Sequence, residues 1–298
     1  MNIISKLISL LIIMTISNIT QANVEISKYT TKNGIKVLYS KSENIPMIDI
    51  RITFDAGSNK DGDLKGISML THSLLDEGTS KMDAESIASV FESNGSVFNT
   101  SVNKDKSSIS LRSLTEKKYL NPSIKMLLSI LSDSVFPKNE MQLQKDRTLT
   151  SIEEDETDPA EIASNLFFKE IYGDYPYAYN TIGQKNTVNK ITRKDVLKFY
   201  KNNINIGNAS IVIISSLSKK EVIDIAEKIS KSLNSTVKES FKDMVLAGIN
   251  KEKHIYKKFS SEQAHIYIGG LSVERGSKNH LPLYVGNYIF GGSGFSAR

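Results

Sequence analysis

Two hydrophobic periodicities succeed one another along this chain, and their order restricts the folds open to it. Residues 24–41 alternate apolar and polar side chains around Asn33-Gly34, a dipeptide typical of hairpin turns. Residues 48–57 alternate again, with Ile48, Ile50, Ile52 and Phe54 on one face. These patterns predict three strands before the first helix.

Helical and strand patterns then mix. A helix is predicted from about Leu64 to Glu77, stopping at Gly78, and a second from the N-cap Asp83 to Asn94-Gly95. Two further alternating segments, 96–103 and 107–114, read as paired strands. The patterns that follow predict helices at about 121–136, 139–156, 159–172, 191–203 and 219–233, and a strand at 209–216.

The pattern restarts after a polar stretch at 234–252. Segments 253–259 and 263–271 alternate like strands, and a helical pattern follows them. Several strands, several helices, one strand and one helix, followed by a fresh start, predict an α+β sandwich and the opening of a second domain.

Composition excludes several classes of function. The 298 residues are 39% hydrophobic and 24% charged, as in a soluble globular protein. The net charge is +5, but the lysines are scattered among acidic residues, so a solvated surface is favoured over nucleic-acid binding. The chain has no cysteine, which excludes disulfides, thiolate metal sites and cysteine nucleophiles.

The first 22 residues resemble an export signal. Lys6 precedes the apolar run Leu7 to Ile16, and Thr20-Gln21-Ala22 offers small residues at a cleavage site. An uncleaved anchor is the alternative, although the run is shorter than the about 20 residues that span a bilayer. We expect an exported mature protein, periplasmic in a Gram-negative host, with no stable membrane span.

Three stretches resemble the insulinase/pitrilysin family of zinc peptidases. Residues 55–105 are similar to the segment around the family's catalytic helix, and 172–218 to the end of its first repeat. Residues 260–271 and 280–298 look like the start of the second repeat with its glycine-rich loop. The resemblance implies a two-layer sandwich with one complete repeat and the start of another.

This resemblance divides the chain into four expected parts. They are a signal peptide at 1–22, a first peptidase-like domain at 23–235, a linker at 236–252 and a C-terminally truncated second domain at 253–298.

The family's catalysts carry His-x-x-Glu-His on one helix, where residues at i and i+4 share a face and grip zinc. Aligned on Gly66 and on Gly78-Thr79, the two ligand positions hold Met69 and Ser73, and the general-base position holds His72. The distant glutamate position falls on Ser151, with Glu153 and Glu154 within one turn. Because thioether and hydroxyl groups are poor zinc ligands, we expect neither metal nor catalytic residues here.

Three other features have competing interpretations. His72 and Asp76 form an i, i+4 pair, which is a metal site only with a third ligand and otherwise a surface or cleft pair. The loop Gly291, Gly292, Ser293 and Gly294 contacts substrate if the resemblance holds, or is a helix stop and turn. The acidic run 153–156 attracts a basic peptide or is a solvated helix end.

The leading hypothesis is a zinc-free homologue that completes the polypeptide-substrate chamber of a separate, zinc-bearing chain of the same family. Zinc is then expected in the partner and not here, and no nucleic acid is involved. Two alternatives remain: a non-functional remnant of a split or truncated gene, and an active metallopeptidase with unrecognised ligands.

Overall fold

A computed structural model of the chain describes residues 25–235 and 252–292. The expected signal peptide and nearly all of the expected linker lie outside the described residues. Within the described ranges, no helix has the length and apolar character needed to cross a membrane.

One mixed sheet forms the centre of the fold. Its six strands lie in the order β1-β2-β6-β3-β5-β4. Only β2 and β6 run parallel, and every other neighbouring pair is antiparallel. The strands are β1 (Ile26–Thr30), β2 (Lys36–Lys41), β3 (Met47–Phe54), β4 (Val97–Val102), β5 (Ser107–Leu114) and β6 (Ala209–Ser215).

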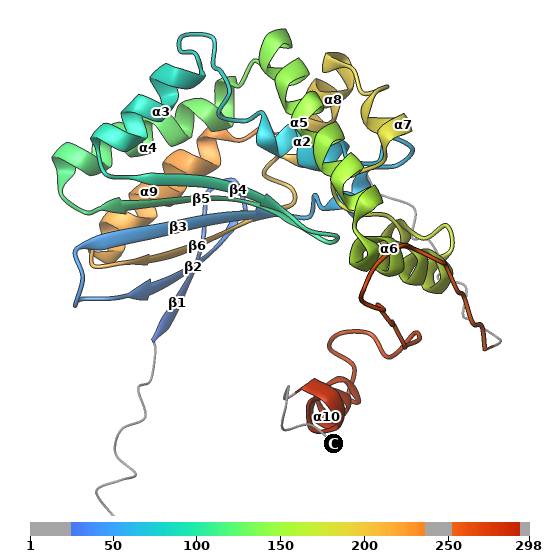
Figure 1. The fold of residues 1–298 in the computed structure, drawn as a ribbon. Coiled ribbons are helices and arrows are strands. Elements are labelled where there is room, and N and C mark those ends of the chain that lie inside the picture. Colours follow the sequence, from blue (N-terminus) through green and yellow to red (C-terminus); the bar gives the residue numbers. More distant parts are fainter. Residues whose placement is uncertain (1–24, 236–251, 293–298) are drawn as a thin grey trace, which may run out of the picture.

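The predicted hairpins are confirmed. β1 and β2 pair across the Asn33-Gly34 turn, where Gly34 has a φ of 88°, and β4 pairs with β5. The predicted face of β3 is also confirmed, because Ile48, Ile50, Ile52 and Phe54 are each at most 1% exposed. These side chains belong to one buried core with residues of the helices. The helices lie over one face of the sheet (Figure 1).

Helices cover that face and extend beyond one end of the sheet. α3, α4 and α9 lie against the strands, whereas α5 and α6 reach away from them (Figure 1). The longer helices are α2 (Ile67–Ser73), α3 (Ala84–Ser93), α4 (Lys117–Asp133), α5 (Lys138–Thr157), α6 (Pro159–Tyr172), α8 (Arg193–Asn203), α9 (Lys219–Ser232) and α10 (His280–Asn287). Shorter turns of helix are η1 (Ser58–Lys60), η2 (Pro176–Ala178), α7 (Lys185–Val188) and η3 (Tyr288–Gly292).

Local capping explains several helix boundaries. Asp83 accepts a hydrogen bond from the Ser86 N–H and caps the start of α3, which ends at Ser93 with the predicted Asn94 as its C-cap. α9 begins with a capping box in which Ser218 and Glu221 each bind the other's backbone N–H. These boundaries follow from short-range hydrogen bonds, so the sequence alone reveals them.

The first helix is shorter than predicted. α2 ends at Ser73, and the backbone continues through tighter turns. In these turns the Leu75 N–H donates to the carbonyl oxygen of His72, and the Glu77 N–H donates to the carbonyl oxygen of Leu74. Gly78 therefore does not cap the helix. It allows a close approach, because a Cβ there would lie 2.7 Å from Cγ of Pro137.

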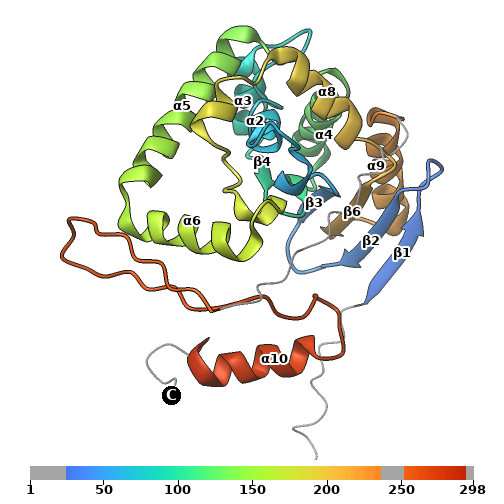
Figure 2. The same ribbon diagram turned by 90° about the vertical axis from the view of Figure 1, so that its right-hand side faces the viewer.

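The two strands predicted at 253–259 and 263–271 are wrong. Neither segment is assigned as a strand within the part of the chain that the structure describes, and their side chains are largely exposed. Alternation favours a strand only where a neighbouring strand pairs with its backbone. The expected helix does form, as α10, which lies away from the sheet (Figure 2).

Candidate functional site

The candidate site is the short helix α2 and the elements that surround it. α2 packs against α8, β4, α5 and η1. Asp61 fixes its first turn, since the carboxylate accepts the N–H of Gly66 at 2.7 Å and of Ser68 at 3.1 Å. Burial raises the pKa of Asp61 to about 6, despite the opposing effect of these two donors.

Glycines let a distant loop approach the start of this helix. Gly66 and Gly183 have φ values of 97° and 90°, and their backbones touch. A Cβ on Gly183 would lie 2.3 Å from the carbonyl oxygen of Lys65, and Thr187 Oγ1 donates to that same oxygen at 2.8 Å. The start of α2 is therefore contacted both by Asp61 and by the loop that contains Gly183 and Thr187.

Met69 and Ser73 occupy the two ligand positions that the resemblance assigns. Both are half-buried on α2, one helical turn apart. The Ser73 hydroxyl donates to the Leu70 carbonyl oxygen at 3.0 Å. Neither side chain offers a nitrogen or a carboxylate to a metal ion.

His72 is buried, at 1% exposure, and the interpretation of a surface or cleft pair with Asp76 is wrong. Its Nδ1 donates to the Ser68 carbonyl oxygen at 2.8 Å, and its Nε2 is buried without a hydrogen-bond partner. Burial lowers the pKa of His72 to about 4, so the ring is neutral at pH 7. No bond joins His72 to Asp76, whose pKa burial raises.

The position assigned to the distant glutamate lies on α5, with two acidic residues close to it. Ser151 holds that position and is exposed, as are Glu153 and Glu154, and Glu153 pairs with Lys185 at 2.5 Å. Closer to α2, Gln144 of α5 donates to Glu77 at 2.6 Å. Among residues 25–235 and 252–292, no three histidine or carboxylate side chains gather as a metal site would require.

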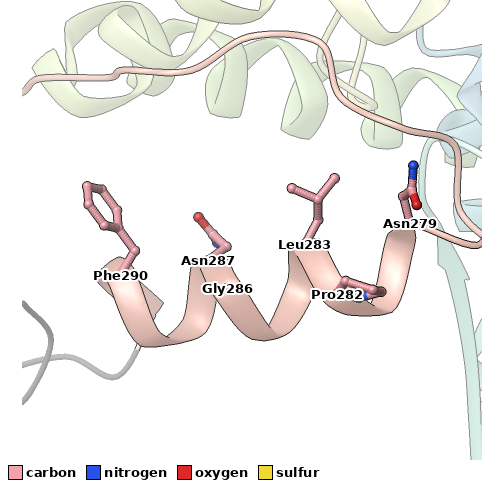
Figure 3. A pocket seen from close by; sticks show the side chains of 6 residues that line it. All are labelled: Asn279, Pro282, Leu283, Gly286, Asn287 and Phe290. Carbon is pink, nitrogen blue, oxygen red and sulfur yellow. The ribbon is translucent and has the colours of Figure 1, made fainter.

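The glycine-rich loop is only partly described. Gly291 and Gly292 end the helical turns of η3, and Ser293 and Gly294 lie outside the described residues. One face of α10 and η3 borders an open hollow of about 630 Å³ (Figure 3). Its lining residues are Asn279, Pro282, Leu283, Gly286, Asn287 and Phe290.

Sequence reasoning missed one set of residues near α2. The loop after α6 packs tyrosines against the β4–β5 turn, where Lys104 Nζ donates to the carbonyl oxygens of Tyr177 at 2.8 Å and Tyr179 at 2.9 Å. The signal was the run Tyr172, Tyr175, Tyr177 and Tyr179, which is unusually rich in tyrosine for a polar loop.

The fold and the composition of α2 define a peptidase-like α+β protein without histidines at the assigned ligand positions. Residues 36–185 match the family described as insulinase (peptidase family M16), and residues 190–298 match the peptidase M16 inactive domain. The chain belongs to the insulinase, or M16, family. β6, from the second match, completes the sheet of the first.

The relatives carry differing names. The chain is 24% identical over 220 residues to an uncharacterized zinc protease of Rickettsia felis, covering 74% of this chain and 52% of that protein. It is 24% identical over 269 residues to the non-peptidase homolog YmxG of Helicobacter pylori, covering 89% and 60%. The chain thus spans about half to two thirds of the length of these relatives.

A solved structure agrees with the fold. The peptidase M16 inactive domain from Pseudomonas fluorescens superposes with a TM-score of 0.81 at 27% identity, covering 92% of this chain and 66% of that one. This chain is accordingly a homologue of the M16 inactive domain.

Proposed function

We propose that this chain is a zinc-free M16 homologue that works as the non-catalytic partner of a separate, zinc-bearing chain and helps to enclose a polypeptide substrate. One observation carries the proposal: α2 offers Met69 and Ser73 where zinc ligands belong, and a buried, neutral His72 where the general base belongs. A base must reach the proton that it removes, and the atom of neutral His72 that could accept one, Nε2, is buried inside the fold.

Two names among the relatives support the proposal. The Helicobacter pylori relative is called a non-peptidase homolog, and another relative is the beta subunit of the mitochondrial-processing peptidase of Neurospora crassa, 22% identical over 208 residues. A protein named as a subunit works within an assembly. We propose the same for this chain, and we place the assembly outside the cytoplasm because of the export signal expected at residues 1–22.

The test is co-expression with an exported family chain from the same genome that contains an intact His-x-x-Glu-His. We expect an equimolar complex in size-exclusion chromatography, zinc in proportion to the partner alone, and no peptidase activity from this chain by itself. A partner whose motif glutamate is replaced by glutamine is the matched control, because it should still form the complex without cleaving.

Metal analysis of the isolated chain gives the opposing result. Stoichiometric zinc in this chain, lost in a correctly folded His72→Asn variant, would contradict the proposal and favour an active metallopeptidase. Failure to form any complex with zinc-bearing family chains would remove the partner role.

A further inference from the structure

Three lysines from separate segments surround one tyrosine beside the start of α2. Lys65 Nζ lies 4.6 Å from the centroid of the Tyr179 ring, and Lys169 Nζ lies 4.8 Å from it. Lys169 Nζ is also 3.2 Å from the Tyr179 hydroxyl oxygen. Lys104 approaches from the β4–β5 turn and donates to the Tyr179 carbonyl oxygen at 2.9 Å. We call Lys65, Lys104, Lys169 and Tyr179 the lysine cluster.

Hydrogen bonds tie together the segments that carry Lys65 and Lys104. Lys104 donates to two backbone carbonyl oxygens, so it ties the β4–β5 turn to the loop after α6. Lys65 immediately precedes Gly66, the N-cap of α2, and its carbonyl oxygen is fixed by Thr187. The backbone of Lys65 is therefore anchored directly before α2, the helix that carries Met69.

The carboxylates nearby offset the charge of the cluster only in part. Asp61 accepts the backbone N–H groups of α2, although the charge of Lys65 also helps to lower its pKa, and Asp105 accepts the hydroxyl of Tyr177. Asp174 pairs with Lys169 at 3.2 Å, but its side chain is 96% exposed, so solvent screens the pair. Among the residues that the structure describes, no carboxylate oxygen lies within 4 Å of Lys65 Nζ.

Lys65 and Lys169 therefore both face one aromatic ring. The ammonium of Lys169 already donates to the Gly173 carbonyl oxygen at 2.8 Å, to Asp174 and to the Tyr179 hydroxyl, so Lys65 has the donors that remain for a ligand. Like charges within a Debye length, about 10 Å at 0.1 M salt, repel one another. An incoming anion relieves that repulsion and accepts hydrogen bonds from the Lys65 ammonium. Half-buried aromatic rings continue the surface on one side, through Phe168, Tyr172, Tyr175 and Tyr177.

We propose that the lysine cluster binds a carboxylate of the polypeptide that this chain holds, either an acidic side chain or a free C-terminus. The proposal rests on the proposed function, because it names the class of polypeptide that the chamber favours. Lys65 contacts the carboxylate, Lys169 adds a positive charge beside it, and Lys104 holds the loop in place. The aromatic rings beside them receive the apolar residues next to the acidic one.

The test measures binding of fluorescein-labelled peptides to the full isolated chain by fluorescence anisotropy. Three peptides differ only in charge: one with central glutamates and an amidated C-terminus, one with glutamines and an amidated C-terminus, and one with glutamines and a free C-terminus. We expect one or both carboxylate-bearing peptides to bind more tightly than the uncharged one, and the advantage to shrink in high salt. The better of the two identifies the source of the carboxylate.

Substitutions of Lys65 and Lys169 test whether the lysine cluster causes the tighter binding of the carboxylate-bearing peptides. Lys65→Gln with Lys169→Gln is expected to weaken carboxylate-peptide binding about tenfold, the usual size for loss of a charged hydrogen bond. The Arg counterparts should retain binding, and the exposed Lys125→Gln on α4 is the matched control. Circular dichroism confirms that each variant folds.

Equal binding of all three peptides, or equal loss in the Lys125→Gln control, would overturn the carboxylate subsite. The proposed function is judged separately, by complex formation and zinc content, neither of which uses these peptides.

Discussion

The Nδ1 atom of His72 lies 2.8 Å from the carbonyl oxygen of Ser68, one turn earlier on α2. Because a carbonyl oxygen only accepts, the proton is on Nδ1 and the buried Nε2 carries the lone pair. The imidazole thus donates its hydrogen bond to a backbone carbonyl oxygen of its own helix. The burial of this ring, which the contact with Ser68 only partly offsets, predicts how the stability of the fold depends on pH.

The first prediction concerns His72. Its pKa falls from 6.5 to about 4 on folding, so between these values the unfolded chain binds a proton that the folded chain does not. The contribution of His72 to the free energy of unfolding is fully present above pH 6.5 and is lost as the pH falls through 4. At 1.36 kcal/mol per pKa unit, the loss is about 3 kcal/mol. In an Asp61→Asn variant, urea unfolding should show stability rising between pH 4 and 6.5.

The second prediction concerns Asp61, which acts in the opposite direction. Its pKa rises from 3.8 to about 6, so the folded chain holds the extra proton and stability falls as the pH rises through this window. A His72→Asn variant should therefore lose up to about 3 kcal/mol between pH 4 and 6. In the unmodified chain the two effects largely cancel. Parallel pH profiles for both variants would contradict the assignment.

The third prediction concerns Lys145 of α5, which is 9% exposed. Its ammonium donates to the carbonyl oxygens of Asn189 at 2.8 Å and Ile191 at 3.1 Å, and so joins α5 to the turn before α8. Lys145→Met keeps the apolar stem and removes both donors, at an expected cost of about 2 kcal/mol. Urea midpoints measure this cost. The exposed Lys138→Met on the same helix should stay within about 0.5 kcal/mol of the parent.

Much of the sheet and of the helices that cover it could be predicted, because the sequence patterns that specify them are local. Asn33-Gly34 sets a hairpin, Asp83 caps α3, and alternation selects the buried face of β3. Non-local pairing was not predicted: β6 enters between β2 and β3, and no short-range pattern specifies that position. The predicted strands at 253–259 and 263–271 are wrong for the same reason, since strand pairing depends on distant neighbours.

In the candidate site, too, the features set by local spacing could be predicted and those set by distant packing could not. Placing Met69, His72 and Ser73 on one helix needed only helical spacing. The burial of His72 was missed because it depends on packing of α2 against α8, β4 and α5. The lysine cluster was missed because Lys65, Lys104 and Lys169 meet only in the folded chain.

The fourth prediction compares two glycines with nearly equal dihedral angles. Gly183 (φ 90°) touches Lys65, whereas Gly34 (φ 88°) has open space around its Cβ position. Gly34→Ala should cost about 1 kcal/mol from left-handed strain alone. Gly183→Ala adds a backbone clash and should cost clearly more, with loosening of the loop at the start of α2. Equal urea midpoints for the two variants would show that the Lys65 contact is dispensable.

The last prediction tests whether positions 69 and 73 are the ones that would face a metal. Both are half-buried and one turn apart on α2, so histidines placed there share a face and can chelate one ion. The variant Met69→His with Ser73→His is expected to bind zinc in calorimetry and to gain about 2.7 kcal/mol of stability at 100 times its Kd. Each single variant is the control and should show little binding, since one imidazole holds zinc weakly. Zinc binding no stronger in the double variant than in either single one would mean that these positions do not converge, and the assignment of the lost ligand positions would fall.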